Sequence, residues 1–270
     1  MKLAISNIAW PIECDASVAD ILVELDIAGI EVAPTKIWPN PLTATDIEID
    51  AYRDIWNQRG IEIVAAQALL FGRPDLTLFD NADVRRKALN YLRDVVRLCA
   101  RLGARSLVFG SPKNRRVESR EPIAVWNEAV EFFGRLGELA TAEGAVVVME
   151  ANPPEYGADF VTRAAEALAL VRAVNHPGFQ LHLDTACMTL AGDDPTQSIS
   201  EAASELAHFH ISEPQLIPIG AGTVDHARFG SLLAKFGYDG WGSIEMKQIN
   251  PFDVQSIRQA IGLVQADYPI

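Results

Sequence analysis

VVVMEANP, residues 146–153, is an apolar run that stops at the acidic residue Glu150. Three later runs have the same form, in which a few Val, Ile, Leu or Phe residues lead to one carboxylate or imidazole: FQLHLDTA at 179–186 with Asp184, AHFHISE at 207–213 with His210, and GSIEMK at 242–247 with Glu245. Short runs of this composition are typical of buried strands in a parallel sheet. A charged residue at the end of a core strand adds nothing to packing, so its recurrence indicates function.

Strand-like runs alternate with amphipathic helical patterns along the whole chain. The strand candidates begin near residues 2, 28, 60, 104, 145, 179, 206 and 240, and the helical patterns cover 15–25, 46–59, 82–102, 122–142, 159–174, 195–205, 225–236 and 253–265. Repeated strand–helix units predict a parallel α/β sheet, and eight of them predict a (β/α)8 TIM barrel. No linker or shift in composition divides the sequence, so residues 1–270 are predicted to form one domain.

Active sites of such barrels lie at the C-terminal ends of the strands, where Glu150, Asp184, His210 and Glu245 would converge. Three carboxylates at one point repel each other unless a positive charge lies between them. One nitrogen and three oxygen donors suit a hard divalent cation. The four residues are therefore predicted to be the ligands of a metal ion.

Composition excludes several classes of partner. The formal net charge is −13, from 36 acidic and 23 basic residues, which argues against nucleic acid or an anionic membrane as the main partner. The three cysteines form no CxxC pair, and the N-terminus lacks the apolar segment of a signal peptide. No apolar run approaches the roughly 20 residues of a membrane helix. A reduced, cytoplasmic protein is expected.

In the motifs MEANP, LHLDT, HFHISE and YDGWGSIEMK the chain resembles the xylose-isomerase-like TIM-barrel superfamily. The resemblance covers essentially the whole chain. It is strongest to the sugar isomerase/epimerase branch, which includes D-tagatose and D-psicose 3-epimerases, hydroxypyruvate isomerase and inosose-processing enzymes.

The resemblance implies one divalent metal ion, Mn, Mg or Co, held by Glu150, Asp184, His210 and Glu245. It also implies that Glu150 and Glu245 are the catalytic pair. One would remove a proton next to a carbonyl and the other would return a proton to the metal-stabilised enediolate. Relatives are often homo-oligomers, but no face of this sequence indicates an interface.

The chain departs from the epimerase pattern at three positions. Cys187 stands where the epimerases have a histidine, and Leu216 stands where they have an arginine. Tyr156 replaces a substrate-binding glutamate, although Glu155 is adjacent and could substitute for it. The resemblance therefore does not imply specificity for tagatose or psicose.

Several side chains are candidates for substrate contact because they follow predicted strands: Trp10, Gln67, Lys113, Arg115, Glu155, Cys187, Glu213 and Lys247. The cations Lys113, Arg115 and Lys247 would suit a substrate that carries an anionic group. The same residue types also occur as ordinary loop packing, and the sequence leaves both interpretations open.

The remaining histidines have less specific signals. His182 alternates with Asp184 along one strand, so it either orients a metal ligand or is a satisfied core histidine. His208 more closely fits a core position. His226 lies in a helical pattern and is expected at the surface.

The sequence thus predicts a metal-dependent isomerase or epimerase of a small sugar or sugar-like hydroxy-carbonyl compound. A lyase or dehydratase on the same barrel is the main alternative, because both reactions share the first proton abstraction. An endonuclease IV-like nuclease is disfavoured by the acidic charge and by a count of five histidines. A non-catalytic sugar-binding barrel is the third alternative.

Overall fold

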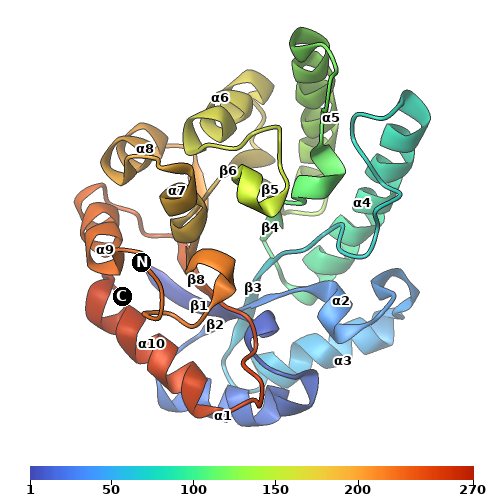
Figure 1. Ribbon diagram of the computed structural model, residues 1–270. Helices are drawn as coiled ribbons and strands as arrows, with labels where there is room; N and C mark the ends of the chain where they lie inside the picture. The colour runs from blue at the N-terminus through green and yellow to red at the C-terminus, as the bar shows by residue number, and fades with distance from the viewer.

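The computed structural model describes residues 1–270 and consists of a closed parallel barrel surrounded by helices (Figure 1). Each strand pairs in parallel with its neighbours in sequence, and the last strand closes the ring by pairing with the first. The strands are β1 (Lys2–Ser6), β2 (Gly29–Val32), β3 (Glu62–Ala66), β4 (Ser106–Phe109), β5 (Val146–Glu150), β6 (Phe179–Asp184), β7 (Leu206–Ser212) and β8 (Trp241–Glu245). The predicted (β/α)8 TIM barrel is confirmed.

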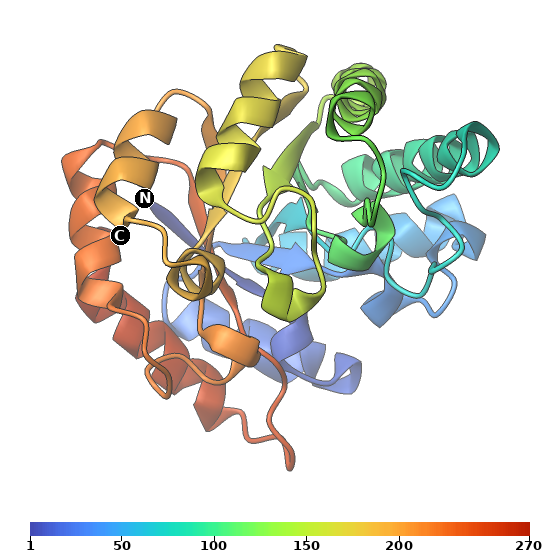
Figure 2. The ribbon, with the colours of Figure 1, turned by 45° about the horizontal axis from the view of Figure 1, so that its top comes forward.

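The longer α-helices form the outer ring of the barrel, as the tilted view in Figure 2 also shows, and two short α-helices lie in the connections after β2 and β6. The α-helices are α1 (Asp15–Glu24), α2 (Pro34–Ile37), α3 (Asp46–Asn57), α4 (Ala82–Leu102), α5 (Pro122–Ala142), α6 (Ala164–Val174), α7 (Thr185–Ala191), α8 (Pro195–Ala202), α9 (His226–Lys235) and α10 (Gln255–Asp267). Short 3₁₀ turns lie in the loops after the strands, among them η4 (Pro112–Arg115), η5 (Pro154–Tyr156) and η6 (Pro214–Leu216). No helix is both long and apolar enough to cross a bilayer.

One helix begins later than predicted, and the two short helices α2 and α7 were not predicted. The pattern at 159–174 begins only at Ala164, because Asp159 lies in the preceding loop and accepts hydrogen bonds from the backbone N–H groups of Val117 and Glu118. The first residue of the seven-residue helix α7 directly follows β6, so the sequence leaves no loop to separate strand from helix.

Most of the apolar core lies between the barrel and the helices, in one cluster of 67 buried residues. The upper interior of the barrel is polar instead. Glu31 on β2 contacts His208 on β7, although β8 and β1 separate those strands in the sheet. The contact therefore crosses the interior, directly beneath the ends of the strands that carry the predicted metal ligands.

Candidate metal centre

The four predicted ligands lie at or near the ends of the consecutive strands β5 to β8 and meet at one point. Their donor atoms all lie within 4.8 Å of one another. Nδ1 of His210 lies 3.4 Å from Oε2 of Glu245 and 3.9 Å from Oε1 of Glu150 and Oδ2 of Asp184. Parallel pairing sets this geometry, because Asp184 and His210 are register partners on β6 and β7.

These residues fit a divalent cation. Nδ1 of His210 is buried and has no hydrogen-bond partner, although three carboxylate oxygens surround it. Donor atoms that share one divalent ion stand about 3–4 Å apart, and the three distances from Nδ1 of His210 to the carboxylates fall in that range. Carboxylate and imidazole donors together suit Mn, Mg or Co, and the chain therefore contains a buried group able to hold a metal ion.

Burial and like charge perturb the two acidic groups that lie deepest. Burial raises the pKa of Glu150 to about 8, and the charges of Asp184 and Glu245 add to the effect. Burial and the charge of Glu245 also raise the pKa of Asp184. Such shifts show that the carboxylates lack a counter-charge at this point, and a bound cation would supply one.

Asp184 is also held by neighbours from two elements. Its Oδ1 accepts a hydrogen bond from the backbone N–H of Cys187 at 2.6 Å and so caps helix α7. Its Oδ2 accepts a hydrogen bond from the hydroxyl of Ser212, also at 2.6 Å. The carboxylate is thereby fixed in rotation before any ligand binds.

Glu31 contacts a predicted ligand, and the sequence analysis missed it. It has no exposed surface, and its carboxylate lies 3.0 and 3.1 Å from Nε2 of His210 and 2.8 Å from Nε2 of His208. Although burial opposes it, the charges of His210 and His208 hold the pKa of Glu31 well below its usual range. The carboxylate therefore fixes the His210 ring so that Nδ1 faces the three carboxylates, as supporting carboxylates do at many metal sites.

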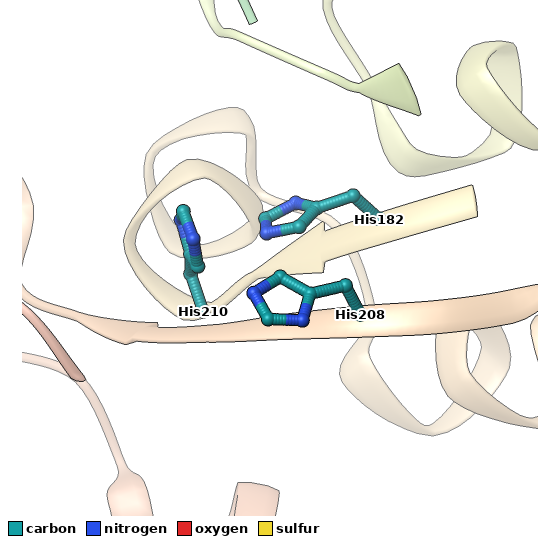
Figure 3. Close-up of side chains that lie close together, drawn as sticks. All are labelled: His182, His208 and His210. Atoms are coloured by element: carbon teal, nitrogen blue, oxygen red, sulfur yellow. The ribbon is translucent and has the colours of Figure 1, made fainter. Parts of the chain in front are cut away.

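The predicted ligand His210 lies close to two further buried histidines, His182 and His208 (Figure 3). The rings of His182 and His210 meet edge to face, with centroids 4.2 Å apart. The ligand atoms of the three histidines also lie within 4.8 Å of one another. However, carboxylates already face both nitrogens of His210, so His182 and His208 pack against His210 rather than forming a separate metal site with it.

A cavity of about 240 Å³ opens onto three of the four predicted ligands, Glu150, Asp184 and Glu245. Its walls come from the loops after β4, β5, β6, β7 and β8, and they consist of Pro112, Glu150, Asn152, Tyr156, Asp184, Ala186, Cys187, Gln215, Leu216, Glu245 and Lys247. A larger cleft of about 720 Å³ lies beside α3 and α4, far from these residues and lined by paired charges. The smaller cavity is the candidate site because the perturbed carboxylates lie within it.

Two of the expected substrate contacts, Cys187 and Lys247, line this cavity. Gln67 is almost fully buried, and its amide donates to Oε1 of Glu245 at 3.0 Å. Lys113 and Glu155 are exposed on the loops after β4 and β5 and do not line the cavity. Tyr156, beside Glu155, does line it, and its hydroxyl accepts a hydrogen bond from the backbone of Gln215.

Arg115 and Trp10 were expected to contact substrate, and the structure corrects both expectations. Arg115 is fully buried, and its guanidinium donates to the backbone carbonyls of residues 110, 150, 160 and 161 and to the side chain of Asn152. No donor remains for a substrate anion. Trp10 is also fully buried, because its ring packs on Trp56 and its N–H binds Asp15.

The expectations for Glu213 and His226 are corrected as well. Glu213 is 1% exposed and accepts hydrogen bonds from the backbone N–H groups of Gly220, Thr223 and Val224. Nε2 of His226 lies 3.2 Å from the same carboxylate, so His226 is buried rather than at the surface. The contacts of Glu213 and His226 hold the loop between β7 and α9 together, and both side chains are buried away from a substrate.

Comparison with known proteins shows the family of the chain. The model of the family described as xylose isomerase-like TIM barrel matches residues 19–266. The chain belongs to this family. A ketose 3-epimerase of Arthrobacter globiformis is 29% identical to this family member over 181 residues, which cover 66% of the chain and 62% of the relative.

Two further comparisons extend the likeness within the family. A D-psicose 3-epimerase of Ruminiclostridium cellulolyticum is 22% identical over 246 residues, which cover 89% of the chain and 82% of the relative. The crystal structure of D-psicose 3-epimerase with D-tagatose from Clostridium cellulolyticum H10 superposes with a TM-score of 0.83 at 19% identity, over the whole of both chains. The superposition supports the fold.

Proposed function

We propose that this protein is a divalent-metal-dependent isomerase or epimerase of a small hydroxy-carbonyl compound of the sugar type. The observation that carries the proposal is the meeting of Glu150, Asp184, His210 and Glu245 around a buried imidazole nitrogen that lacks a partner. The names of the ketose and psicose 3-epimerases that the chain resembles support the same class of reaction.

Two glutamates in one metal site suit proton transfer at carbon. A C–H bond next to a carbonyl is only weakly acidic, and a divalent cation at this site would stabilise the negative charge that develops on the substrate oxygens. Glu150 and Glu245 come from β5 and β8, which are separated in the sheet by two other strands, and we expect one to remove the proton and the other to return one to the opposite face. Inversion at the carbon is the result.

The cavity limits the size and the charge of the substrate. Its volume of about 240 Å³ admits a small molecule, and Lys247 is the only cation among its lining residues. An exposed ammonium at the cavity suits a substrate with a carboxylate or phosphate substituent. Tyr156, Cys187 and Leu216 form the other wall, where the ketose 3-epimerase pattern has more strongly hydrogen-bonding side chains.

Solvent deuterium uptake by candidate substrates tests the proposal. Ketoses, inososes and hydroxy-keto acids are incubated in D₂O with the Mn²⁺-loaded protein, and the products are analysed by mass spectrometry. We expect one substrate to gain a single deuteron next to its carbonyl, and we expect Glu245→Gln to lose this exchange while retaining its fold and its melting profile.

Glu62→Gln is the matched control, because Glu62 is an exposed glutamate at the start of β3 and does not line the cavity. It should exchange at the wild-type rate. Undiminished exchange in Glu245→Gln would contradict the two-glutamate mechanism. A product lighter by one water would instead identify a lyase.

A further inference from the structure

Each of the two glutamates is held by one side-chain amide. Nδ2 of Asn152 donates to Oε2 of Glu150 at 2.9 Å, and Nε2 of Gln67 donates to Oε1 of Glu245 at 3.0 Å. In both cases the other carboxylate oxygen is the one that faces Nδ1 of His210, at 3.9 Å for Glu150 and 3.4 Å for Glu245. The amides thus divide each carboxylate into a bound oxygen and an oxygen that faces the metal position.

Arg115 determines which way the Asn152 amide points. Its Nη2 donates to Oδ1 of Asn152 at 2.9 Å, and the same nitrogen donates to the carbonyl of Glu150 at 3.1 Å. A guanidinium has no acceptor, so only the oxygen of Asn152 can face it, and the NH₂ group must face Glu150. The buried arginine therefore fixes the donor that Glu150 receives.

Gln67 has no such support. Its Oε1 is buried without a hydrogen-bond partner. The Gln67 amide is therefore oriented only by the carboxylate of Glu245, which accepts a hydrogen bond and so must face the NH₂ group. The two halves of the site thus have the same form, but the Glu150 half has an additional layer of hydrogen bonds. Glu150 is the more rigidly held of the two glutamates.

We propose that Asn152 and Gln67 are positioning residues for Glu150 and Glu245, and that Arg115 acts on Glu150 through Asn152. The inference deepens the proposed function, because it rests on the same metal site. Hydrogen-bond partners of metal ligands typically contribute about 10–100-fold to metal affinity, since they hold each ligand in the binding orientation.

Mn²⁺ titration of the purified full chain tests the proposal without a substrate. We expect Asn152→Ala and Gln67→Ala each to weaken Mn²⁺ binding by about 10–100-fold relative to wild type. The melting temperature of the metal-free protein is measured in parallel, because any buried amide that is removed should lower it.

Asn114→Ala is the matched control. Asn114 is buried like Asn152 and lies in the neighbouring loop after β4, but its amide donates to the backbone carbonyls of Arg73 and Leu76 and touches no predicted metal ligand. It should lower the melting temperature and leave Mn²⁺ affinity unchanged. A loss of affinity equal to that of Asn152→Ala would overturn the positioning role, since a general loosening of the loops at this end of the barrel would then explain both.

The link through Arg115 is tested by a double-mutant cycle. Arg115→Lys should weaken Mn²⁺ binding in the wild-type background and add nothing in the Asn152→Ala background, because the two residues act as one unit. Additive losses of Mn²⁺ affinity would contradict the proposal that Arg115 acts through Asn152. If Arg115→Lys cannot be purified, the Asn152, Gln67 and Asn114 variants decide the proposal by themselves.

The outcomes separate this inference from the proposed function. Absence of Mn²⁺ binding to the wild-type chain would overturn both. Binding to wild type that Glu150→Gln abolishes, together with unchanged affinity in Asn152→Ala and Gln67→Ala, would retain the metal site and refute the positioning residues.

Discussion

Glu31 is a carboxylate with no exposed surface, in the middle of an apolar strand. Burying an unpaired charge costs several kcal/mol, so such a residue persists only where its partners are fixed. The partners here are the Nε2 atoms of His208 and His210, on the far side of the barrel. The single carboxylate thereby sets the tautomer of His210, with Nε2–H toward Glu31 and the Nδ1 lone pair toward the metal position.

Glu31→Gln tests this arrangement. The amide keeps the shape of the side chain but removes its charge, so His210 becomes a weaker and less firmly oriented donor. We expect Mn²⁺ affinity to fall by about 10–100-fold, measured by titration. Glu62→Gln, which changes an exposed glutamate at the start of β3, should leave the affinity unchanged. Equal affinity in both variants would exclude a supporting role for Glu31.

The individual residues show what the sequence could and could not predict. The strand-end positions of Glu150, Asp184, His210 and Glu245 follow from the apolar runs before them, and the structure brings all four together. Glu31 also interrupts an apolar run, GIEV, but its partner His208 is 177 residues away, and only closure of the barrel brings them into contact.

Whereas Glu31 was missed, Arg115 was predicted to contact substrate and does not. A basic loop after a strand resembles an anion-binding loop, and the sequence gives no sign that one of its cations turns inward. The turn η4 directs the guanidinium toward the carbonyls of neighbouring loops, which are unsatisfied because parallel strands end there. Backbone acceptors of this kind are invisible in the sequence.

At the scale of elements, the buried carboxylate of Glu213 holds together the loop that follows β7. The carboxylate of Glu213 accepts three backbone N–H groups from residues 220, 223 and 224 and one contact from His226. It therefore joins the end of β7 to the start of α9. The backbone after β7 also forms part of the cavity wall, through Gln215 and Leu216. Closing this loop gives the cavity its shape.

Glu213→Ala should therefore destabilise the protein. Removal of the carboxylate leaves buried backbone N–H groups without acceptors, and we expect a loss of about 3 kcal/mol in the free energy of unfolding. Urea denaturation measures it. The exposed Glu155→Ala, on the loop after β5, should change the free energy of unfolding by less than about 0.5 kcal/mol. A small effect in both variants would show that the loop closes without Glu213.

The eight strands and most of the outer helices could be predicted because their periodicity is local. The four-residue helix α2 and the seven-residue α7 could not, because neither is long enough to show a helical period. Helix α7 depends instead on Asp184, which caps it and also belongs to the metal site. In the sequence, Asp184 is a single acidic residue after an apolar run. That pattern indicates a metal ligand, and nothing in it indicates that the same carboxylate also caps a helix.

At the scale of the whole molecule, the barrel collects negative charge at the centre of an already acidic chain. The formal net charge is −13, and three carboxylates lie together at one end of the barrel. Without a cation, the folded protein reduces this repulsion by retaining protons. The pKa of Glu150 is raised to about 8 by burial and by its acidic neighbours, and that of His210 is raised because the charges of Glu31 and Glu245 outweigh burial.

This predicts how the stability of the metal-free protein depends on pH. Between pH 7 and 8.5 the unfolded chain has already lost its carboxyl and imidazole protons, whereas folded Glu150 gives up its proton only as the pH passes about 8. The folded state therefore binds more protons, and its stability falls as the pH rises through this window. For one such group the loss is about 1 kcal/mol, or roughly 2 °C in melting temperature.

Differential scanning fluorimetry from pH 7 to 8.5 measures this dependence with EDTA and with saturating Mn²⁺. The melting temperature in EDTA should decline with rising pH, and Mn²⁺ should remove the decline, because the cation takes the place of the protons and binds best to deprotonated ligands. Glu150→Gln in EDTA should show a shallower decline, since the glutamine has no proton to lose. A decline of equal slope in wild type and Glu150→Gln would show that the pH dependence arises elsewhere in the molecule. Repulsion among the strand-end carboxylates would then not be what a bound metal ion relieves.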